Sequence, residues 1–242
     1  MPSEIAGKHA LVTGGGRGIG QAIAKALAER GARISIVSRT VHEHAGASAD
    51  VTNEDQVRRA FEACREKNGP IEILVNNSGI AESAPLMRTG LAMWERIMAT
   101  NVTGTFLCTR EAVEDMLIAK WGRIVNVASV AGLGGAPYVS AYCASKHAVV
   151  GFTRSIAAEF EGTGVTANVV CPGYTETDMM RKALENIKKF TGCTAEEARE
   201  RLASTNPGGR IATVDEVAEA TLEFVTGDHN GAAMVVPGNV LV

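Results

Sequence analysis

The chain of 242 residues is poor in aromatic side chains (5%) and has only 5 cysteines, and its charges nearly cancel. The cysteines are odd in number and form no CxxC pair, which argues against a disulfide framework or a zinc site. A formal charge of -3 without a long basic run argues against nucleic acid or an anionic membrane as partner, because both need concentrated positive charge. A bound anion would therefore have to be held by local geometry.

Long apolar segments are also absent. No apolar run approaches the ~18 residues that span a membrane. The first residues, MPSEIAGKHALVTG, carry Glu4 and reach a glycine cluster without the apolar core of a signal peptide. Because the cysteine pattern also suits a reducing compartment, we expect a cytoplasmic protein.

Short β-branched apolar runs alternate with longer segments whose apolar residues recur at helical spacing. The expected strands are His9–Thr13, Arg33–Val37, Ile71–Asn76, Arg123–Val127, Val165–Cys171 and Ala233–Val236. The expected helices are Ile19–Arg30, Glu54–Lys67, Thr105–Lys120, Ser140–Glu161 and Val214–Val225. This alternation predicts an α/β fold with a doubly wound parallel sheet and helices on both faces. No linker or repeat divides the chain, so we expect a single domain over residues 1–242.

The connection after the second expected strand is short. Thr40–Ala49 is all that precedes Asp50, and a crossover helix with a further strand needs a dozen or more residues. We therefore expect an abbreviated crossover. His42 and His44 form an HxH pair within it, but a metal site would need a third ligand, so we interpret the stretch as a solvated loop and expect no metal.

A glycine-rich turn, TGGGRGIG, joins the first expected strand to the first expected helix. In that position Gly14 permits a tight turn, Gly18 lets backbone N–H groups approach a pyrophosphate, and Gly20 allows the helix to pack closely on the strand. The helix N-terminus adds a partial positive charge. A glycine turn without a ligand is the alternative. The candidate phosphate-binding residues are Thr13, Gly14, Arg17, Gly18, Ile19 and Gly20.

The end of the second expected strand bears on the choice of dinucleotide. Sites selective for NAD place an Asp or Glu there, on the adenosine ribose, whereas this chain has Ser38 and Arg39. A guanidinium can bind a 2′-phosphate that a carboxylate would repel. Arg39, with Arg17 in the glycine turn, therefore favours NADP, with NAD as the second choice. The alternative is that both arginines are ordinary surface residues.

Three residues further along suit acid–base chemistry. Ser129 follows an expected strand, and Tyr142 and Lys146 lie four residues apart at the start of an expected helix, which puts both on one helical face. A nearby lysine cation favours the phenolate and lowers the pKa of a tyrosine, which could then exchange a proton with a carbonyl or alcohol oxygen. Tyr-x3-Lys alone also arises by chance on amphipathic helices.

Together these motifs closely resemble the short-chain dehydrogenase/reductase family over nearly the whole length. The matches are TGGGRGIG at 13–20, DV at 50–51, NNSG at 76–79, TNVTG around Asn101, Ser129, YCASK at 142–146 and PGYTET at 172–177. The chain is also similar to 3-oxoacyl-thioester reductases and polyketide ketoreductases. The resemblance implies a Rossmann-type sheet and the homotetrameric assembly that is usual in the family.

The resemblance also implies roles for single residues. Tyr142 would be the general acid/base, and Lys146 would lower its pKa and bind the nicotinamide ribose. Ser129 would hold the substrate oxygen, and Asn101 would order a water that relays protons. The remaining cofactor contacts would come from Asp50, Val51, Asn77, Ser78, Gly79, Pro172, Gly173, Thr175 and Thr177.

Three segments depart from the family pattern or leave their role open. The shortened Thr40–Ala49 stretch alters the wall beside the adenosine ribose, and the C-terminal MVVPGNVLV lacks the usual Asp-Gly-Gly. Residues 177–213 would form a substrate lid. Its Met179, Met180 and Phe190 either line an adaptable apolar pocket or pack against the sheet.

The function we expect is an NADP(H)-dependent oxidoreductase that interconverts a ketone and a secondary alcohol, with a CoA or carrier-protein 3-oxoacyl thioester as one candidate substrate. A catalytically idle dinucleotide-binding sensor or partner subunit is the alternative. A sugar-nucleotide epimerase would need a larger C-terminal domain. We expect a homotetramer, or at least a dimer, because the two central helices carry surplus apolar residues, namely Val113, Met116, Val149, Val150 and Phe152.

Overall fold

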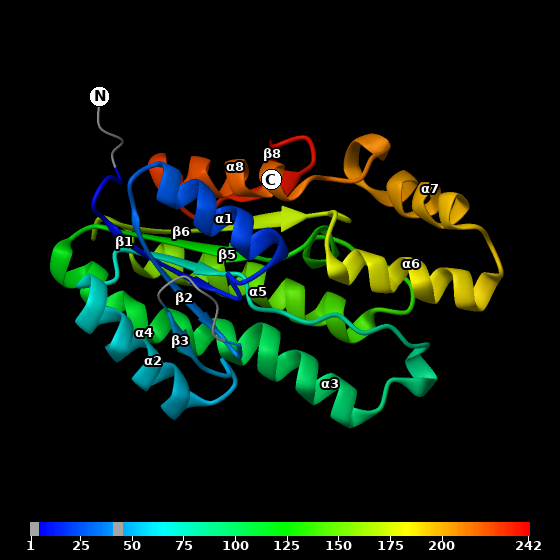
Figure 1. The fold of residues 1–242 in the computed structure, drawn as a ribbon, viewed down its shortest axis with the longest axis horizontal. Helices are drawn as coiled ribbons and strands as arrows, with labels where there is room; N and C mark the ends of the chain where they lie inside the picture. The colour runs from blue at the N-terminus through cyan, green and yellow to red at the C-terminus, as the bar shows by residue number, and fades with distance from the viewer. Residues whose placement is uncertain (1–4, 41–45) are drawn as a thin grey trace.

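A computed structural model describes residues 5–40 and 46–242, and these build one eight-stranded sheet (Figure 1). The strand order is β3-β2-β1-β4-β5-β6-β7-β8, in which only β8 runs antiparallel to its neighbour. The strands are β1 (His9–Thr13), β2 (Arg33–Ser38), β3 (Ala47–Ser48), β4 (Ile73–Asn76), β5 (Gly122–Val127), β6 (Val165–Pro172), β7 (Ala233–Val236) and β8 (Val240–Leu241). The central strands are buried on both faces, as in doubly wound sheets.

Helices cover both faces of the sheet (Figure 1). They are α1 (Gly18–Glu29), α2 (Glu54–Asn68), α3 (Leu91–Met98), α4 (Gly104–Ala119), α5 (Ser140–Glu159), α6 (Asp178–Thr191), α7 (Ala195–Thr205) and α8 (Val214–Thr226). One apolar core joins α1 and α8 to the sheet through residues such as Leu27 and Phe224. The other joins α2, α4 and α5 to the opposite face, around Phe61 and Met116.

This architecture confirms the expected doubly wound parallel sheet. Every strand and helix expected from the sequence forms, with ends that differ by two residues at most. The strands β3 and β8 and the helix α3 were missed: β3 and β8 have two residues each, and α3 is a short helix in which only Ile97 is buried. Residues 41–45, which include His42 and His44, lie outside the described residues.

Parallel register brings the carboxyl ends of β1, β4 and β5 to one edge of the sheet. Thr13 is paired with Asn76, and Asn76 with Asn126, so the loops that follow these strands emerge side by side. Ligands of doubly wound sheets bind at this edge. The glycine turn, the NNSG stretch and Ser129 all follow these strand ends.

The apolar residues that we expected at a subunit interface lie in the core. Met116, Val149 and Val150 are buried, because α4 and α5 rest directly on the sheet. Val113 and Phe152 pack against the core from its margin. The apolar side chains that α4 does expose are Phe106, Leu117 and Ile118, the last of them 76% exposed.

Candidate active site

The glycine turn packs against the loop that follows β4. The hydroxyl of Thr13 accepts hydrogen bonds from the backbone N–H groups of Asn77 and Ser78, both at 3.0 Å. Gly14 has a φ of +65°, and a Cβ on Gly20 would lie 2.5 Å from the carbonyl oxygen of Gly14. The turn therefore needs glycine for its backbone conformation at one position and for close packing at the other.

Arg17 occupies the N-cap position of α1 and forms an ion pair with the start of α6. Its Nη1 lies 3.2 Å from the carboxylate of Asp178, the first residue of α6, which also pairs with Arg181. A Cβ on Gly18 would lie 3.5 Å from the methyl group of Thr177. The glycine turn thus contacts the start of the segment expected to form a lid, and the proposed phosphate contact of Arg17 competes with an ion pair.

The adenosine side of the site is formed by the ends of β2 and β3. Arg39 is exposed, and its carbonyl accepts a hydrogen bond from Ser48 at 3.1 Å, while Ser38 donates to the carbonyl of Thr40 at 2.5 Å. A backbone hydrogen bond from Thr52 lowers the pKa of Asp50, with a further contribution from the charge of Arg39. Asp50 is therefore an anion beside the arginine expected to select the cofactor.

Asn101 is buried and ties the turn at the start of α4 to the loop after β4. It lies in the π-helical turn Ala99–Thr103. Its Oδ1 accepts from the N–H of Ile80 at 2.8 Å, and its Nδ2 donates to the carbonyl of Ile80 at 3.0 Å and to Ser145 at 2.9 Å. This amide fixes the backbone next to Gly79, where a Cβ would lie 3.5 Å from the Nζ of Lys146.

Tyr142, Lys146 and Ser129 meet at the carboxyl end of β5. Lys146 is 6% exposed, donates to the carbonyl of Val127 at 2.8 Å and lies 5.7 Å from the centre of the Tyr142 ring. Ser129 caps the short helical turn Val130–Gly132. Tyr142 keeps part of its surface exposed. The structure therefore brings together the predicted catalytic residues, which the chain places in three different segments.

Burial dominates the electrostatics of this cluster. Burial raises the pKa of Tyr142 to about 12, although a hydrogen bond with Ser129 acts in the opposite direction. Burial lowers the pKa of Lys146 to about 8. Desolvation of the buried phenol therefore sets the pKa of Tyr142 in the protein alone, and the expected lowering by Lys146 stays a prediction.

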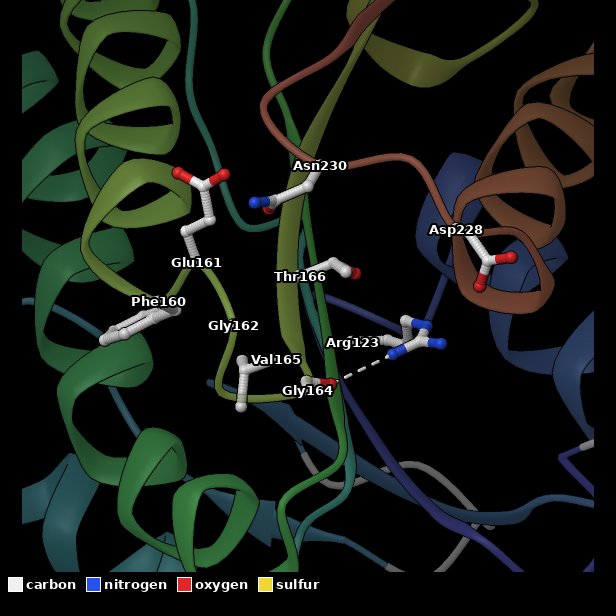
Figure 2. A pocket seen from close by; sticks show the side chains of 9 residues that line it. All are labelled: Arg123, Phe160, Glu161, Gly162, Gly164, Val165, Thr166, Asp228 and Asn230. Atoms are coloured by element: carbon white, nitrogen blue, oxygen red, sulfur yellow. Dashed lines mark hydrogen bonds between the residues drawn. The ribbon is translucent and has the colours of Figure 1, made fainter.

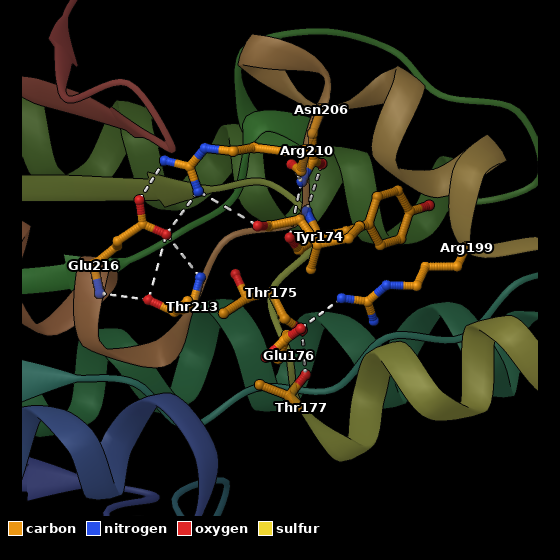
Figure 3. Close-up of polar contacts among 10 residues, drawn as sticks. Tyr174, Thr175, Glu176, Thr177, Arg199, Asn206, Arg210, Thr213 and Glu216 are labelled. Atoms are coloured by element: carbon orange, nitrogen blue, oxygen red, sulfur yellow. Dashed lines mark hydrogen bonds and ion pairs between the residues drawn. The ribbon is translucent and has the colours of Figure 1, made fainter. Parts of the chain in front are cut away.

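The loop after β6 carries the remaining predicted residues and leads into segment 177–213 (Figure 3). Thr175 donates to the carbonyl of Gly173 at 3.1 Å, and the hydroxyl of Thr177 caps α6. Sequence reasoning missed Asn206, whose buried side chain binds the backbone of Tyr174. The only signal in the sequence was that Asn206 precedes Pro207 and two glycines, which indicates a turn and not a hydrogen bond to a distant loop.

The lid residues divide between the core and the surface. Met180 is buried, which favours packing over pocket lining for that residue. Met179 and Phe190 are exposed, as are Tyr138 and Tyr174 on neighbouring loops. The expected apolar lining therefore excludes Met180.

The residues present fit a dinucleotide. The glycine turn leads into the N-terminus of α1, where backbone N–H groups can face a phosphate, and Lys146 supplies a buried ammonium group at the carboxyl end of β5. The groups that would hold the cofactor are the turn residues 13–20, Arg39, Asp50, Val51, the loop 77–79, Lys146 and the loop 172–177. No group of three or more metal-ligating side chains occurs within residues 5–40 and 46–242.

A hollow of about 260 Å³ lies at the opposite edge of the sheet (Figure 2). Its walls include Arg123 at the start of β5 and Thr166 at the start of β6, with Asp228 and Asn230 on the connection to β7. It lies away from the glycine turn and from Tyr142, because both of those follow the carboxyl ends of strands. The hollow is therefore separate from the candidate active site.

Comparison with known proteins places the chain in a family. The short chain dehydrogenase model matches residues 8–188. The chain is 38% identical to 2-(S)-hydroxypropyl-CoM dehydrogenase 3 of Xanthobacter autotrophicus, over 99% of each protein. It is 34% identical to a 3-oxoacyl-[acyl-carrier-protein] reductase of Aquifex aeolicus, over 94% of this chain and 96% of that protein.

A solved structure agrees with these relatives. An actinorhodin polyketide ketoreductase variant with NADPH superimposes with a TM-score of 0.91, at 32% identity and over 98% of each chain. The chain belongs to the short-chain dehydrogenase family, whose members are NAD(P)-dependent oxidoreductases acting on CH–OH and C=O groups. This confirms the family and the class of enzyme that the sequence motifs indicate. None of the described helices is long and apolar enough to cross a membrane.

Proposed function

We propose that the protein interconverts a ketone and a secondary alcohol with NADP(H), and that Tyr142 is its acid–base group. The observation that carries this proposal is the convergence of Ser129, Tyr142, Lys146 and Asn101 at the sheet edge that also holds the glycine turn. An idle dinucleotide-binding protein would have no chemical need for these four residues together. The nicotinamide, when bound, supplies or accepts the hydride.

The side chains have separate tasks in this proposal. Ser129 holds the substrate oxygen, and Tyr142 gives that oxygen a proton during reduction or removes one during oxidation. Because the pKa of Tyr142 is about 12, the phenol carries its proton at neutral pH and suits the donor role. Lys146 binds the nicotinamide ribose and, as a cation, stabilises a developing phenolate. Asn101 fixes the neighbouring loop and, through its backbone, orders the relay water.

The cofactor preference rests on the end of β2. Position 38, at the end of β2, is a serine and not an aspartate or glutamate, and the next residue is the exposed Arg39. A 2′-phosphate at this place would therefore meet a guanidinium and no carboxylate on the same strand. The related ketoreductase with NADPH supports the same choice. NAD is the second choice, and Asp50 on the neighbouring loop would favour it.

The proposed substrate is a carbonyl compound on a thioester arm. The 3-oxoacyl reductase and the polyketide ketoreductase among the relatives support a 3-oxoacyl chain on CoA or a carrier protein. Segment 177–213 would cover such a chain as a lid, within the single domain of residues 1–242. Exposed Met179 and Phe190 would contact the apolar part of the substrate.

Replacement of Tyr142 by Phe tests the proposal, because it keeps the ring and removes the hydroxyl. Turnover of acyl-CoA ketones, followed by NADPH oxidation, should fall at least ~10²-fold, while NADPH affinity stays nearly constant. Ser129→Ala should likewise lower turnover and spare cofactor binding. More than about a tenth of wild-type turnover in Tyr142→Phe would refute the acid–base role. A wild type that binds NADPH but reduces no carbonyl in a broad screen would favour the idle binder.

We also propose a cytoplasmic homotetramer. The described cysteines are free thiols, four of them buried, which suits a reducing compartment. Phe106, Leu117 and Ile118 leave an apolar face on α4, and Val240 and Leu241 expose apolar side chains on the edge strand β8. Sedimentation at micromolar concentration should show an assembly, whereas a 25.4 kDa monomer would refute it.

A further inference from the structure

Asn206 makes three side-chain hydrogen bonds, and two of them join the end of α7 to the loop after β6 (Figure 3). Its Oδ1 accepts from the N–H of Tyr174 at 2.7 Å. Its Nδ2 donates to the carbonyls of Tyr174 at 2.8 Å and Arg210 at 2.7 Å. The residue is 6% exposed, so water does not compete for these contacts. The amide thus pairs with both backbone groups of Tyr174, as a neighbouring strand would.

The same side chain explains why a glycine precedes Tyr174. A Cβ on Gly173 would lie 2.5 Å from the Oδ1 of Asn206 and 2.8 Å from its Cγ. The φ of Gly173 is not in the left-handed region, so its backbone conformation does not itself demand glycine. The close approach of the asparagine is therefore the constraint at this position.

The clamped backbone lies beside the reacting groups. Gly173 follows β6 directly, its N–H binds the carbonyl of Val236 at 2.7 Å, and β6 is the neighbour of β5, from which Ser129 emerges. Ala128 also donates to the carbonyl of Val170 at 2.8 Å. Gly173 and Tyr174 therefore lie at the same end of the sheet as Ser129, next to the strand from which it emerges.

We propose that Asn206 is a positioning residue that holds the backbone of Gly173 and Tyr174 against the nicotinamide half of the cofactor. It couples the last part of segment 177–213 to the catalytic edge, because its own backbone belongs to that segment. The inference rests on the proposed function and deepens it. An amide is required, since only a group with both a donor and an acceptor can satisfy the N–H and the carbonyl of one residue.

Binding of two ligands tests this inference. The probes are NADPH and 2′,5′-ADP, which carries the adenosine half without the nicotinamide. Asn206→Ala should weaken NADPH about 10-fold, lower turnover, and leave 2′,5′-ADP affinity unchanged. Arg199→Ala is the matched control, because Arg199 joins the same helix α7 to Glu176 through an exposed ion pair. It should change neither affinity by more than about two-fold.

A further variant, Gly173→Ala, keeps Asn206 and so does not depend on how well Asn206→Ala folds. It should reproduce the loss of NADPH affinity, since its methyl group displaces the Oδ1 of Asn206. Gly173→Ala should also be made in the Asn206→Ala background. There it should change the logarithm of the NADPH dissociation constant by less than half of its effect in the wild type, because the side chain with which the methyl group clashes is absent.

The outcomes separate this inference from the proposed function. Wild-type binding of NADPH is measured first, and its absence would contradict the proposed function. Where the wild type binds NADPH, equal losses of both ligands in Asn206→Ala, no loss of either, or additive effects in the double variant would overturn the positioning role.

Discussion

The two ends of the proposed cofactor path differ in how their polar groups are held. At the catalytic end, Lys146 and Asn101 are 6% and 1% exposed, and their hydrogen bonds are with backbone groups and a buried hydroxyl. At the glycine turn, the side chains of Arg17 and Asp178 are 76% and 41% exposed and meet as an ion pair in water. Buried hydrogen bonds therefore fix the side chains at the catalytic end, whereas a solvent-exposed ion pair holds those at the glycine turn.

This difference has energetic consequences. Burial in the low-dielectric interior disfavours the charged form of a group, and this raises the pKa of Tyr142 and lowers the pKa of Lys146. Exposed pairs are screened by salt and contribute roughly 0–1 kcal/mol each. Substitutions at the catalytic end should thus change chemistry and stability, whereas substitutions at the turn should mainly adjust affinity.

The largest expected effect comes from Lys146→Met, which replaces the buried ammonium by an apolar chain of similar size. Turnover should fall ~10²–10⁴-fold, because the phenol of Tyr142 loses its cationic neighbour. The free energy of unfolding at pH 7 should rise, by about 3 kcal/mol at most, since the lowered pKa measures the cost of burying the charge. Kinetics and denaturant unfolding measure the two effects.

The pH dependence of this variant provides the control. The pKa of Lys146 is lowered on folding, so the cost of its charge is complete below about 8 and disappears as the pH rises toward ~10.4. The stability difference between Lys146→Met and wild type should shrink over that range. Wild-type turnover that depends on the ammonium should also decline above pH 8. A constant stability difference from pH 7 to 10 would contradict the buried charge.

An intermediate effect is expected from Arg39→Ala at the adenosine end. Loss of a charged hydrogen bond to a 2′-phosphate costs ~1.5–3 kcal/mol, so NADPH should bind roughly 10- to 150-fold more weakly and NADH nearly as before. Titration of cofactor fluorescence measures both. Equal wild-type affinities for NADH and NADPH would show that Asp50 and the shortened Thr40–Ala49 connection decide the preference instead.

The smallest effects should come from the ion pair between the glycine turn and α6. Arg17→Ala and Asp178→Asn should each change NADPH affinity by less than about five-fold, and the changes should shrink as salt rises from ~0.05 to ~0.5 M. Asp215→Asn, in the first turn of α8, controls for loss of an acidic residue near a helix N-terminus. A salt-resistant loss above about 10-fold, confined to NADPH and to Arg17→Ala, would instead make Arg17 a phosphate ligand.

The residues that sequence reasoning found are those defined by local pattern. The glycines between a strand and a helix can be interpreted from the sequence alone once those two elements are predicted. The same holds for Tyr142 and Lys146, because a spacing of four residues puts both on one face of any helix. The parallel strands could also be predicted, because burial on both faces leaves continuous apolar runs. The burial of Met116, Val149 and Val150 within the chain could not be predicted, because the apolar pattern of α4 and α5 does not distinguish a core face from a surface that a partner would cover.

The sequence by itself determined the order of elements, the family and the residues that gather at one edge of the sheet. Only the tertiary structure decided which partners they have there. Arg17 meets Asp178 across 161 positions, and Asn206 binds Tyr174 across 32. The pKa values of Tyr142 and Lys146 likewise follow from desolvation by surrounding segments. Local spacing fixes the face on which a side chain lies, but its charge state and contacts depend on distant segments brought close by packing.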